Sequence, residues 1–165
     1  MTKERLDKIL EEHKKWWETD GREGKQADLR GADLREADLR GAYLRSADLS
    51  GANLVDADLR NAELSHAILR YTDLMAADLR DARLVCADMR GTDLMFADLR
   101  NAELSHASLM FANLRRTDLR HANLFGASLY HADLCRAGLT GTKLTVADLR
   151  GADLSGVTTE GDVTL

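Results

Sequence analysis

The stretch ADLRNAELSHA occupies residues 57–67 and returns unchanged at residues 97–107. Shorter segments of the form A-D-L-R-x recur every five residues, and 26 of them follow one another without a gap from residue 27 to residue 156. Their first position is Ala or Thr, and their third is Leu in every copy except the one with Met89. A repeat this regular has to be explained before any other feature of the chain.

A period of five residues fits neither an α-helix nor a flat strand. In a helix five residues advance about 500°, so the leucines would spiral over every side. On a strand an odd period would send successive leucines to opposite faces. The chain therefore has to turn once per repeat, with the first and third positions inward and the other three outward. Such a core needs no large rings, and the chain has 5% aromatic residues and no proline.

The number of sides follows from the size of one repeat. About three extended residues span ~10 Å, and opposite walls that meet through Leu and Ala also need about 10 Å. A square of four repeats, with twenty residues per turn, satisfies both distances. The forty-residue return of ADLRNAELSHA is then two whole turns. We predict an all-β solenoid in which 26 repeats make about 6.5 coils.

The run ADLRG-ADLRE-ADLRG at residues 27–41 resembles the pentapeptide-repeat family. The resemblance extends over residues 27–156, nearly four-fifths of the chain. It implies a right-handed quadrilateral β-helix with four repeats per coil. Its members also include proteins that resemble duplex DNA and bind type II topoisomerases, which they inhibit or protect from quinolones.

The two ends of the chain depart from the repeat. Residues 1–26 carry apolar and aromatic side chains at helical spacing, with Thr2 as a candidate N-cap and Gly21 and Gly24 as stop signals. We expect an N-terminal amphipathic α-helical cap over the open end of the solenoid; the alternative is a partner-binding helix. Residues 157–165 form the expected C-terminal tail or cap. The cap residues are Leu6, Ile9, Leu10, His13, Trp16 and Trp17.

Composition narrows the classes of function. The net charge is −5, no basic tail is present, and no apolar run reaches the length of a membrane span or a signal peptide. We expect a cytoplasmic protein that binds neither membrane nor nucleic acid directly. Two cysteines, Cys86 and Cys135, fit a reduced compartment or plain apolar use better than a disulfide framework. The chain has no phosphate loop or nucleophile motif, so we expect no enzyme and no cofactor.

Stacking the chain in twenties places side chains in columns about 4.8 Å apart. One side then alternates acids and arginines, which predicts either a self-neutralising solvated surface or a docking surface for a charged partner. Another column holds His66, Cys86 and His106 beside a Glu63, Arg83 and Glu103 ion-pair column; a flat column suits no tetrahedral metal site, and we expect none. The charged face comprises Asp38, Arg40, Asp58, Arg60, Asp78, Arg80, Asp98, Arg100, Asp118 and Arg120.

A cluster of outward apolar residues departs from this polar surface. Such clusters are interface candidates, although scattered surface hydrophobic residues are the alternative. Further along, Met110, Phe125 and Tyr130 add apolar surface that could serve self-association. The candidate interaction patch comprises Val55, Tyr71, Met75, Ala76, Met95, Phe96 and Phe111.

Two functions are therefore in competition. The first is a non-catalytic scaffold that binds an unknown protein partner. The second, implied by the resemblance, is a DNA-mimic modulator of a type II topoisomerase such as gyrase. The repeat region has 16 basic and 19 acidic residues, a net charge of −3. B-DNA of the same length would carry about 18 negative charges over ~30 Å. We therefore favour the scaffold.

Overall fold

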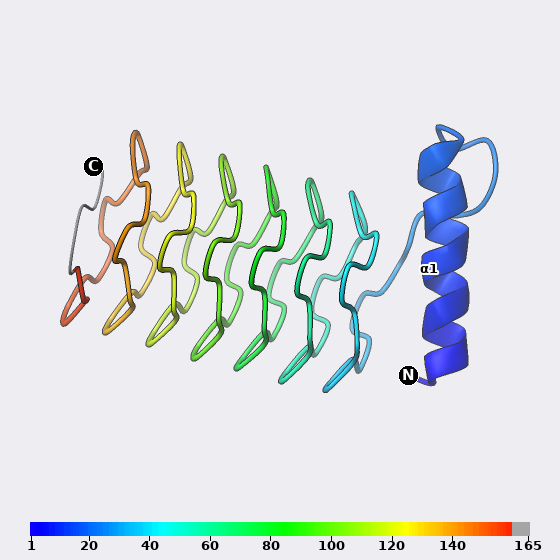
Figure 1. Cartoon of the computed structure of the whole chain (residues 1–165), viewed down its shortest axis with the longest axis horizontal. Coiled ribbons are helices and arrows are strands. Elements are labelled where there is room, and N and C mark those ends of the chain that lie inside the picture. The colour runs from blue at the N-terminus through cyan, green and yellow to red at the C-terminus, as the bar shows by residue number, and fades with distance from the viewer. Residues whose placement is uncertain (160–165) are drawn as a thin grey trace.

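The computed structural model describes residues 1–159 and consists of one helix followed by a stack of coils (Figure 1). The helix is α1, Lys3–Glu18. Parallel bridges join the second position of each repeat to the second position twenty residues on, from Asp28–Asp48 to Gly138–Thr158. One turn therefore takes four repeats, and the predicted repeat β-solenoid is confirmed. The two ADLRNAELSHA copies lie on the same sides, two turns apart.

Hydrogen bonds between coils follow one rule along the whole stack. The Leu59 N–H donates to the Asp78 carbonyl at 2.7 Å, and the Asp78 N–H donates back to the Ala57 carbonyl at 2.9 Å. Only one residue per side pairs in this way, so among residues 1–159 the bridges stay isolated. Each side has the three residues expected, such as 57–59, with the bridge at the middle one, and each corner begins directly after the leucine.

Each corner is a tight turn in which the fifth residue of the repeat has a left-handed backbone conformation. At one corner Asn61 has a φ of 58°, and the Ala62 N–H donates to the Leu59 carbonyl at 3.0 Å. This conformation is unfavourable for residues other than glycine. The Asn61 N–H offsets that cost by donating to the Arg80 carbonyl of the next coil at 3.0 Å. The corners therefore tolerate many residue types at the fifth position, which is where the sequence varies.

The interior is built from the first and third positions. Ala57, Leu59 and Met89 are all no more than 1% exposed, and burial of each leucine contributes roughly 1.5–3 kcal/mol. Thr replaces Ala at four buried first positions without leaving a polar group unsatisfied. The Thr92 hydroxyl, for example, donates to the Leu69 carbonyl at 2.7 Å. Thr72, Thr117 and Thr142 make the equivalent bond.

Helix α1 lies at the N-terminal end of the stack (Figure 1). Its first turn is capped by Thr2, whose hydroxyl oxygen accepts from the Arg5 N–H at 3.4 Å. Leu6 is buried, and Ile9 and Leu10 are half-buried against the apolar core. These three side chains pack against the core at this end, and all three belong to the set that the sequence singled out for a cap.

His13 is the fully buried member of this face. Its Nδ1 accepts a hydrogen bond from the Ala27 N–H at 3.0 Å, which joins α1 to the first repeat. Burial lowers the pKa of His13, and the nearby Arg45 backbone opposes that shift. Trp16 and Trp17 are only half-buried: Trp16 stacks on His13, and Trp17 lies under the Arg45 guanidinium. The tryptophans therefore line the edge of the contact, and its centre is formed by Leu6 and His13.

The C-terminal end is described only in part. Val157 packs against the core, and the Thr158 N–H donates to the Ala137 carbonyl at 3.0 Å. Residues 160–165 of the expected tail at 157–165 lie outside the described residues. Within residues 1–159 no helix combines the length and the apolar character that crossing a bilayer requires.

Candidate interaction surfaces

The ladder face consists of the repeats whose second and fourth positions are Asp and Arg in successive coils. The Arg80 guanidinium contacts Asp78 of its own repeat at 2.6 Å and Asp98 of the next coil at 3.6 Å. Each carboxylate also accepts a backbone N–H two residues on, as Asp78 does from Arg80 at 3.2 Å. The ladder face spans residues 37–41, 57–61, 77–81, 97–101 and 117–121.

These contacts lower the pKa of Asp38 and Asp78, which favours their charged form. The hydrogen bond from Arg40 is the largest influence on Asp38 and lowers its pKa to about 2. The Arg80 side chain likewise lowers the pKa of Asp78. Each acid is paired within its repeat, and from Asp58 onward each also lies near the arginine of the previous coil. The ladder face therefore satisfies its charges internally.

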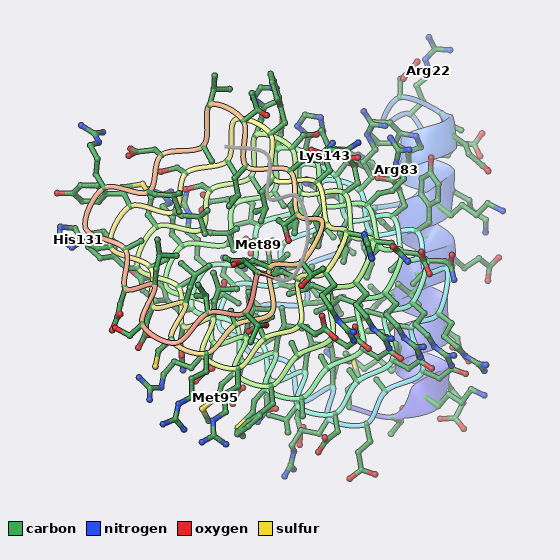
Figure 2. All side chains as sticks on the ribbon, turned by 60° about the vertical axis from the view of Figure 1, so that its left-hand side comes forward. Arg22, Arg83, Met89, Met95, His131 and Lys143 are labelled. Carbon is green, nitrogen blue, oxygen red and sulfur yellow. The ribbon has the colours of Figure 1, made fainter. Side chains whose placement is uncertain are left out.

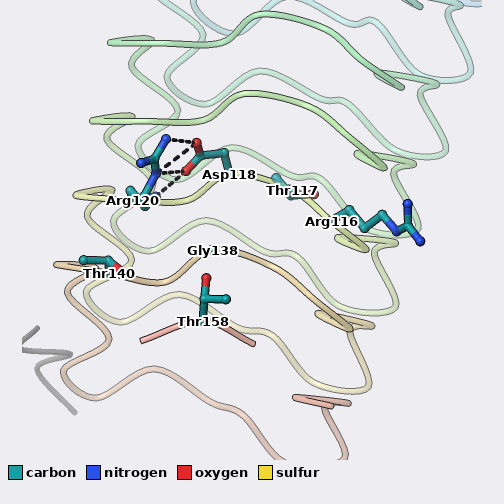
Figure 3. Close-up of a pocket in the computed structure, with 7 residues that line it drawn as sticks. All are labelled: Arg116, Thr117, Asp118, Arg120, Gly138, Thr140 and Thr158. Carbon is teal, nitrogen blue, oxygen red and sulfur yellow. Dashed lines mark hydrogen bonds and ion pairs between the residues drawn. The ribbon is translucent and has the colours of Figure 1, made fainter. Parts of the chain in front are cut away.

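The ladder ends at a hollow of about 440 Å³ beside Gly138 (Figure 3). Arg120 binds Asp118 at 2.6 Å, but the next coil offers Gly138 where earlier coils offer Asp. A Cβ on Gly138 would lie 3.5 Å from the nearest Asp118 oxygen, an ordinary contact. The hollow thus marks a missing ladder side chain. Arg116 and Arg120 both line the hollow, and Figure 3 shows the Arg116 side chain extending away from the Arg120–Asp118 pair.

The patch face consists of residues 52–56, 72–76 and 92–96, on the side that precedes the ladder face in each coil. Bridges between Asn53, Asp73 and Asp93 place Val55, Met75 and Met95 in one column. These three side chains are half-buried, whereas Ala76 and Phe96 at the following corner are exposed. In Figure 2 Met95 lies on the outer edge of the coils, in contrast to Met89 inside them.

Aromatic side chains border the patch face on its preceding corner. Tyr71 is 76% exposed and Phe111 is 60% exposed. The Tyr71 ring lies over Gly91 of the next coil, where a Cβ would come within 2.7 Å of it. The Phe111 ring stacks on His131, with centroids 5.7 Å apart. The Tyr71 ring thus fits over the next corner because that corner has no side chain.

The structure places the seven residues of the predicted interaction patch on two adjacent corners, Tyr71 and Phe111 on one and the other five on the next. The sequence reasoning missed two of their neighbours, Arg116 and His131, and had placed a third, Tyr130, outside the patch. Arg116 lies over the Phe96 ring at 5.4 Å, and Tyr130 and His131 pack around Phe111. Counting twenty residues on from Phe96 and Phe111 would have found Arg116 and His131.

The side chains of the column that invited a metal hypothesis do not converge. His66, Cys86 and His106 are exposed at successive corners, and within residues 1–159 no three ligand-type side chains converge. The neighbouring ion-pair column forms in part. Arg83 contacts Glu63 at 3.2 Å, whereas Glu103 accepts instead from Asn123 at 2.8 Å.

Comparison with known proteins defines the family. The model for pentapeptide repeats (8 copies) matches residues 25–61, 57–95, 92–129 and 118–156. The chain matches no curated protein sequence.

Solved structures of the same kind are similar to this chain. HetL, a pentapeptide repeat protein involved in heterocyst differentiation regulation in the cyanobacterium Nostoc sp. strain PCC 7120, is 35% identical with a TM-score of 0.53. That match covers 84% of this chain and 74% of HetL. A thylakoid-lumen pentapeptide repeat protein of Arabidopsis thaliana is 30% identical over 69% of each chain, with a TM-score of 0.48.

The fluoroquinolone resistance protein QnrB1 is more distant. It is 21% identical, with a TM-score of 0.33, over 82% of this chain and 90% of its own. At that distance the likeness carries no functional argument. The family model spans most of the chain, and the bridges between coils repeat every twenty residues. This chain belongs to the pentapeptide-repeat family.

Proposed function

We propose that this protein is a non-catalytic scaffold that binds a protein partner through the patch face. The observation that carries the proposal is the exposure of Tyr71, Phe96 and Phe111, at 76, 49 and 60%, around one half-buried methionine column. Exposed aromatic and methionine side chains that gather in one place are typical of protein interfaces. Elsewhere the outward positions are mostly charged or small, and the ladder face pairs its own charges.

In this proposal the remainder of the molecule is a stiff frame. The frame is a right-handed quadrilateral β-helix, and α1 closes its N-terminal end as a cap. HetL is involved in the regulation of heterocyst differentiation. We assign this chain a regulatory role of the same general kind, exerted through binding.

The test compares partner capture by three forms of the protein. Immobilised wild type is exposed to a lysate of the native host, and the bound proteins are identified by mass spectrometry. The variant Met75→Lys, Met95→Lys, Phe96→Lys disrupts the patch face. A matched control, Val85→Lys, Phe125→Lys, Val146→Lys, makes the same change in charge on the opposite side of the coil.

We expect the partner to be retained by the control and lost by the patch variant, because truncating or charging central apolar contacts removes most binding energy. Far-UV circular dichroism checks that both variants keep the fold. Equal capture by all three forms would contradict the proposal. So would inhibition of gyrase supercoiling by micromolar wild-type protein, which is the result expected of a DNA mimic.

A further inference from the structure

The patch face carries two acids that have no cationic partner. In repeats of the form Asp-Leu-Arg, the arginine two residues on pairs with the aspartate, as Arg80 does with Asp78 at 2.6 Å. Asp73 and Asp93 instead belong to Asp-Leu-Met, at residues 73–75 and 93–95. Among residues 1–159 neither makes an ion pair, although each accepts the N–H of its methionine.

The coil below offers these acids no cation either. Ladder arginines reach the aspartate eighteen residues on, as Arg60 reaches Asp78 at 3.5 Å. The residues eighteen before Asp73 and Asp93 are Val55 and Met75, which carry no charge. Both routes that neutralise an acid on the ladder face are therefore closed on the patch face. The remaining polar contact is an amide, the Asn113 side chain, 3.0 Å from Asp93.

The surroundings of these carboxylates specify what could neutralise them. Met75 and Met95 lie beside them as half-buried apolar side chains, and Phe96 is exposed at the next corner. Two cations lie nearby: Arg115, which follows Met95 in the column and pairs with Asp133 at 3.0 Å, and Arg116, whose guanidinium lies over the Phe96 ring at 5.4 Å. A ligand for this surface needs a positive group for each acid and an apolar stem or side chain for the methionines. Lysine and arginine side chains have that combination.

We propose that the partner presents a basic amphipathic helix to the patch face, with two Lys or Arg side chains on Asp73 and Asp93. This inference rests on the proposed function and specifies its partner. The two acids are one coil apart, about 4.8 Å. Side chains at positions i and i+4 of a helix are about 5–6 Å apart, so a helix running along the stack meets both acids. Its apolar stripe then covers Met75, Met95 and Phe96.

The same charges disfavour the other classes of partner. Phosphates and acidic segments would be repelled by Asp73 and Asp93, whereas the ladder face has few unneutralised charges to attract them. The proposal therefore names a cationic protein segment, and polyanions are outcomes that the test can reveal.

Isothermal titration calorimetry tests the proposal with a designed peptide. The probe is a helical peptide of about 18 residues, or five turns. Lys residues spaced i, i+4 form one stripe along its helix, and Leu residues with the same spacing form the adjacent stripe. Its twin carries Glu in place of every Lys. The protein variant is Asp73→Asn with Asp93→Asn, which keeps the hydrogen bonds to the backbone. Asn53 and Asn113 already make that bond in the same column, at 3.1 and 3.2 Å.

A second variant separates specific pairing from attraction to the net negative charge. Asp81→Asn with Glu103→Gln removes the same two charges away from the patch. Asn61 and Asn101 occupy the corner positions next to Asp81, and Glu103 lies on the opposite side of the coil, where it accepts from the Asn123 side chain. We expect the Lys peptide to bind the Asp73→Asn, Asp93→Asn protein about tenfold more weakly than wild type. The control pair should bind it within about twofold of wild type.

Three results would overturn the inference. These are equal weakening in the two double variants, undiminished affinity in the Asp73→Asn, Asp93→Asn protein, and binding of the Glu peptide as tightly as the Lys peptide. The proposed function is tested separately, by capture of the natural partner. If the lysine variant of the patch loses its natural partner while the paired Asn variant binds the Lys peptide normally, the scaffold stands and the basic helix is wrong.

Discussion

The ladder face and the patch face are built from the same five-residue repeat and differ mainly at one position. On the ladder face Asp78 lies between Arg80 and Arg60, at 2.6 and 3.5 Å. On the patch face Asp73 occupies the same place in its repeat, with Met75 and Val55 where those arginines would be. Replacing Arg by Met at the fourth position thus turns a surface that neutralises itself into one with free acids and apolar side chains. The repeat supplies the frame, and the fourth and fifth positions supply the difference between its sides.

We expect the largest loss of stability from charging a core leucine on either face, because both faces depend on the same core. Leu74→Asp, on the patch face, and Leu79→Asp, on the ladder face, should both abolish cooperative thermal unfolding followed by circular dichroism. Both leucines are 0% exposed. An unpaired charge buried there costs at least several kcal/mol, comparable with the whole stability of a domain. A cooperative transition within a few degrees of wild type in either variant would show that its leucine is not a core residue.

Deleting residues 1–24 removes α1 from the N-terminal end of the solenoid. We expect the truncated protein to stay rich in β-structure but to associate, because uncovered coil edges are templates for strand addition. Light scattering after size-exclusion chromatography measures the mass of the species formed. A truncated protein that stays monomeric and as stable as wild type would mean that α1 is not a cap, and would favour a partner-binding helix.

The contact between His13 and Ala27 predicts a pH dependence of a few kcal/mol or less at this same end. Burial lowers the pKa of His13, so the folded chain keeps it neutral while the unfolded chain binds a proton below about pH 6.5. Its stabilising contribution is therefore complete above that pH and is lost as pH falls through the folded pKa. Protonation would also place a hydrogen on Nδ1, which has to accept from Ala27.

The measurement is the free energy of urea unfolding at pH 8, 7, 6 and 5. Wild type should lose stability on acidification through this range, and His13→Leu should be less stable at pH 8 but lose less on acidification. Parallel pH profiles for the two proteins would contradict the assigned role of His13.

Exchanging the fourth-position residues between the faces has a smaller effect on stability. Arg80→Met gives the ladder face an Asp-Leu-Met repeat and should cost about 1 kcal/mol or less, since these ion pairs are partly exposed. Met75→Arg gives the patch face an Asp-Leu-Arg repeat and should raise the free energy of unfolding by a few tenths of a kcal/mol. The same change should weaken binding of the Lys peptide. Urea unfolding at low and high salt measures both, because screening should shrink each difference. Changes of the opposite sign would show that the pairing rule does not govern these faces.

The sequence was sufficient to predict the solenoid, its twenty-residue turn and the inward Ala and Leu, because a strict period of five leaves few alternatives. It was less informative where side chains from different coils meet. Nothing local to Phe111 indicates that its ring stacks on His131, and Gly91 shows its use only once Tyr71 is known to lie over it.

The role of His13 was also hidden in the sequence. Its helical spacing placed it on the covered face, but its hydrogen bond to Ala27 depends on how α1 crosses the first coil. The unpaired acids could have been predicted from the sequence, since Asp73 and Asp93 are each followed two residues later by a methionine instead of the usual arginine. They were missed because the apolar residues beside them were considered without their charged neighbours.

The five methionines permit the most direct test of where a partner binds. Methyl-labelled methionine gives one NMR signal each from Met75 and Met95 on the patch face, from Met89 in the core, and from Met1 and Met110 elsewhere. On titration with the Lys peptide, we predict shifts at Met75 and Met95, with Met89 and Met1 unchanged. Shifts confined to Met1 or Met110, with Met75 and Met95 unmoved, would contradict the assignment of binding to the patch face.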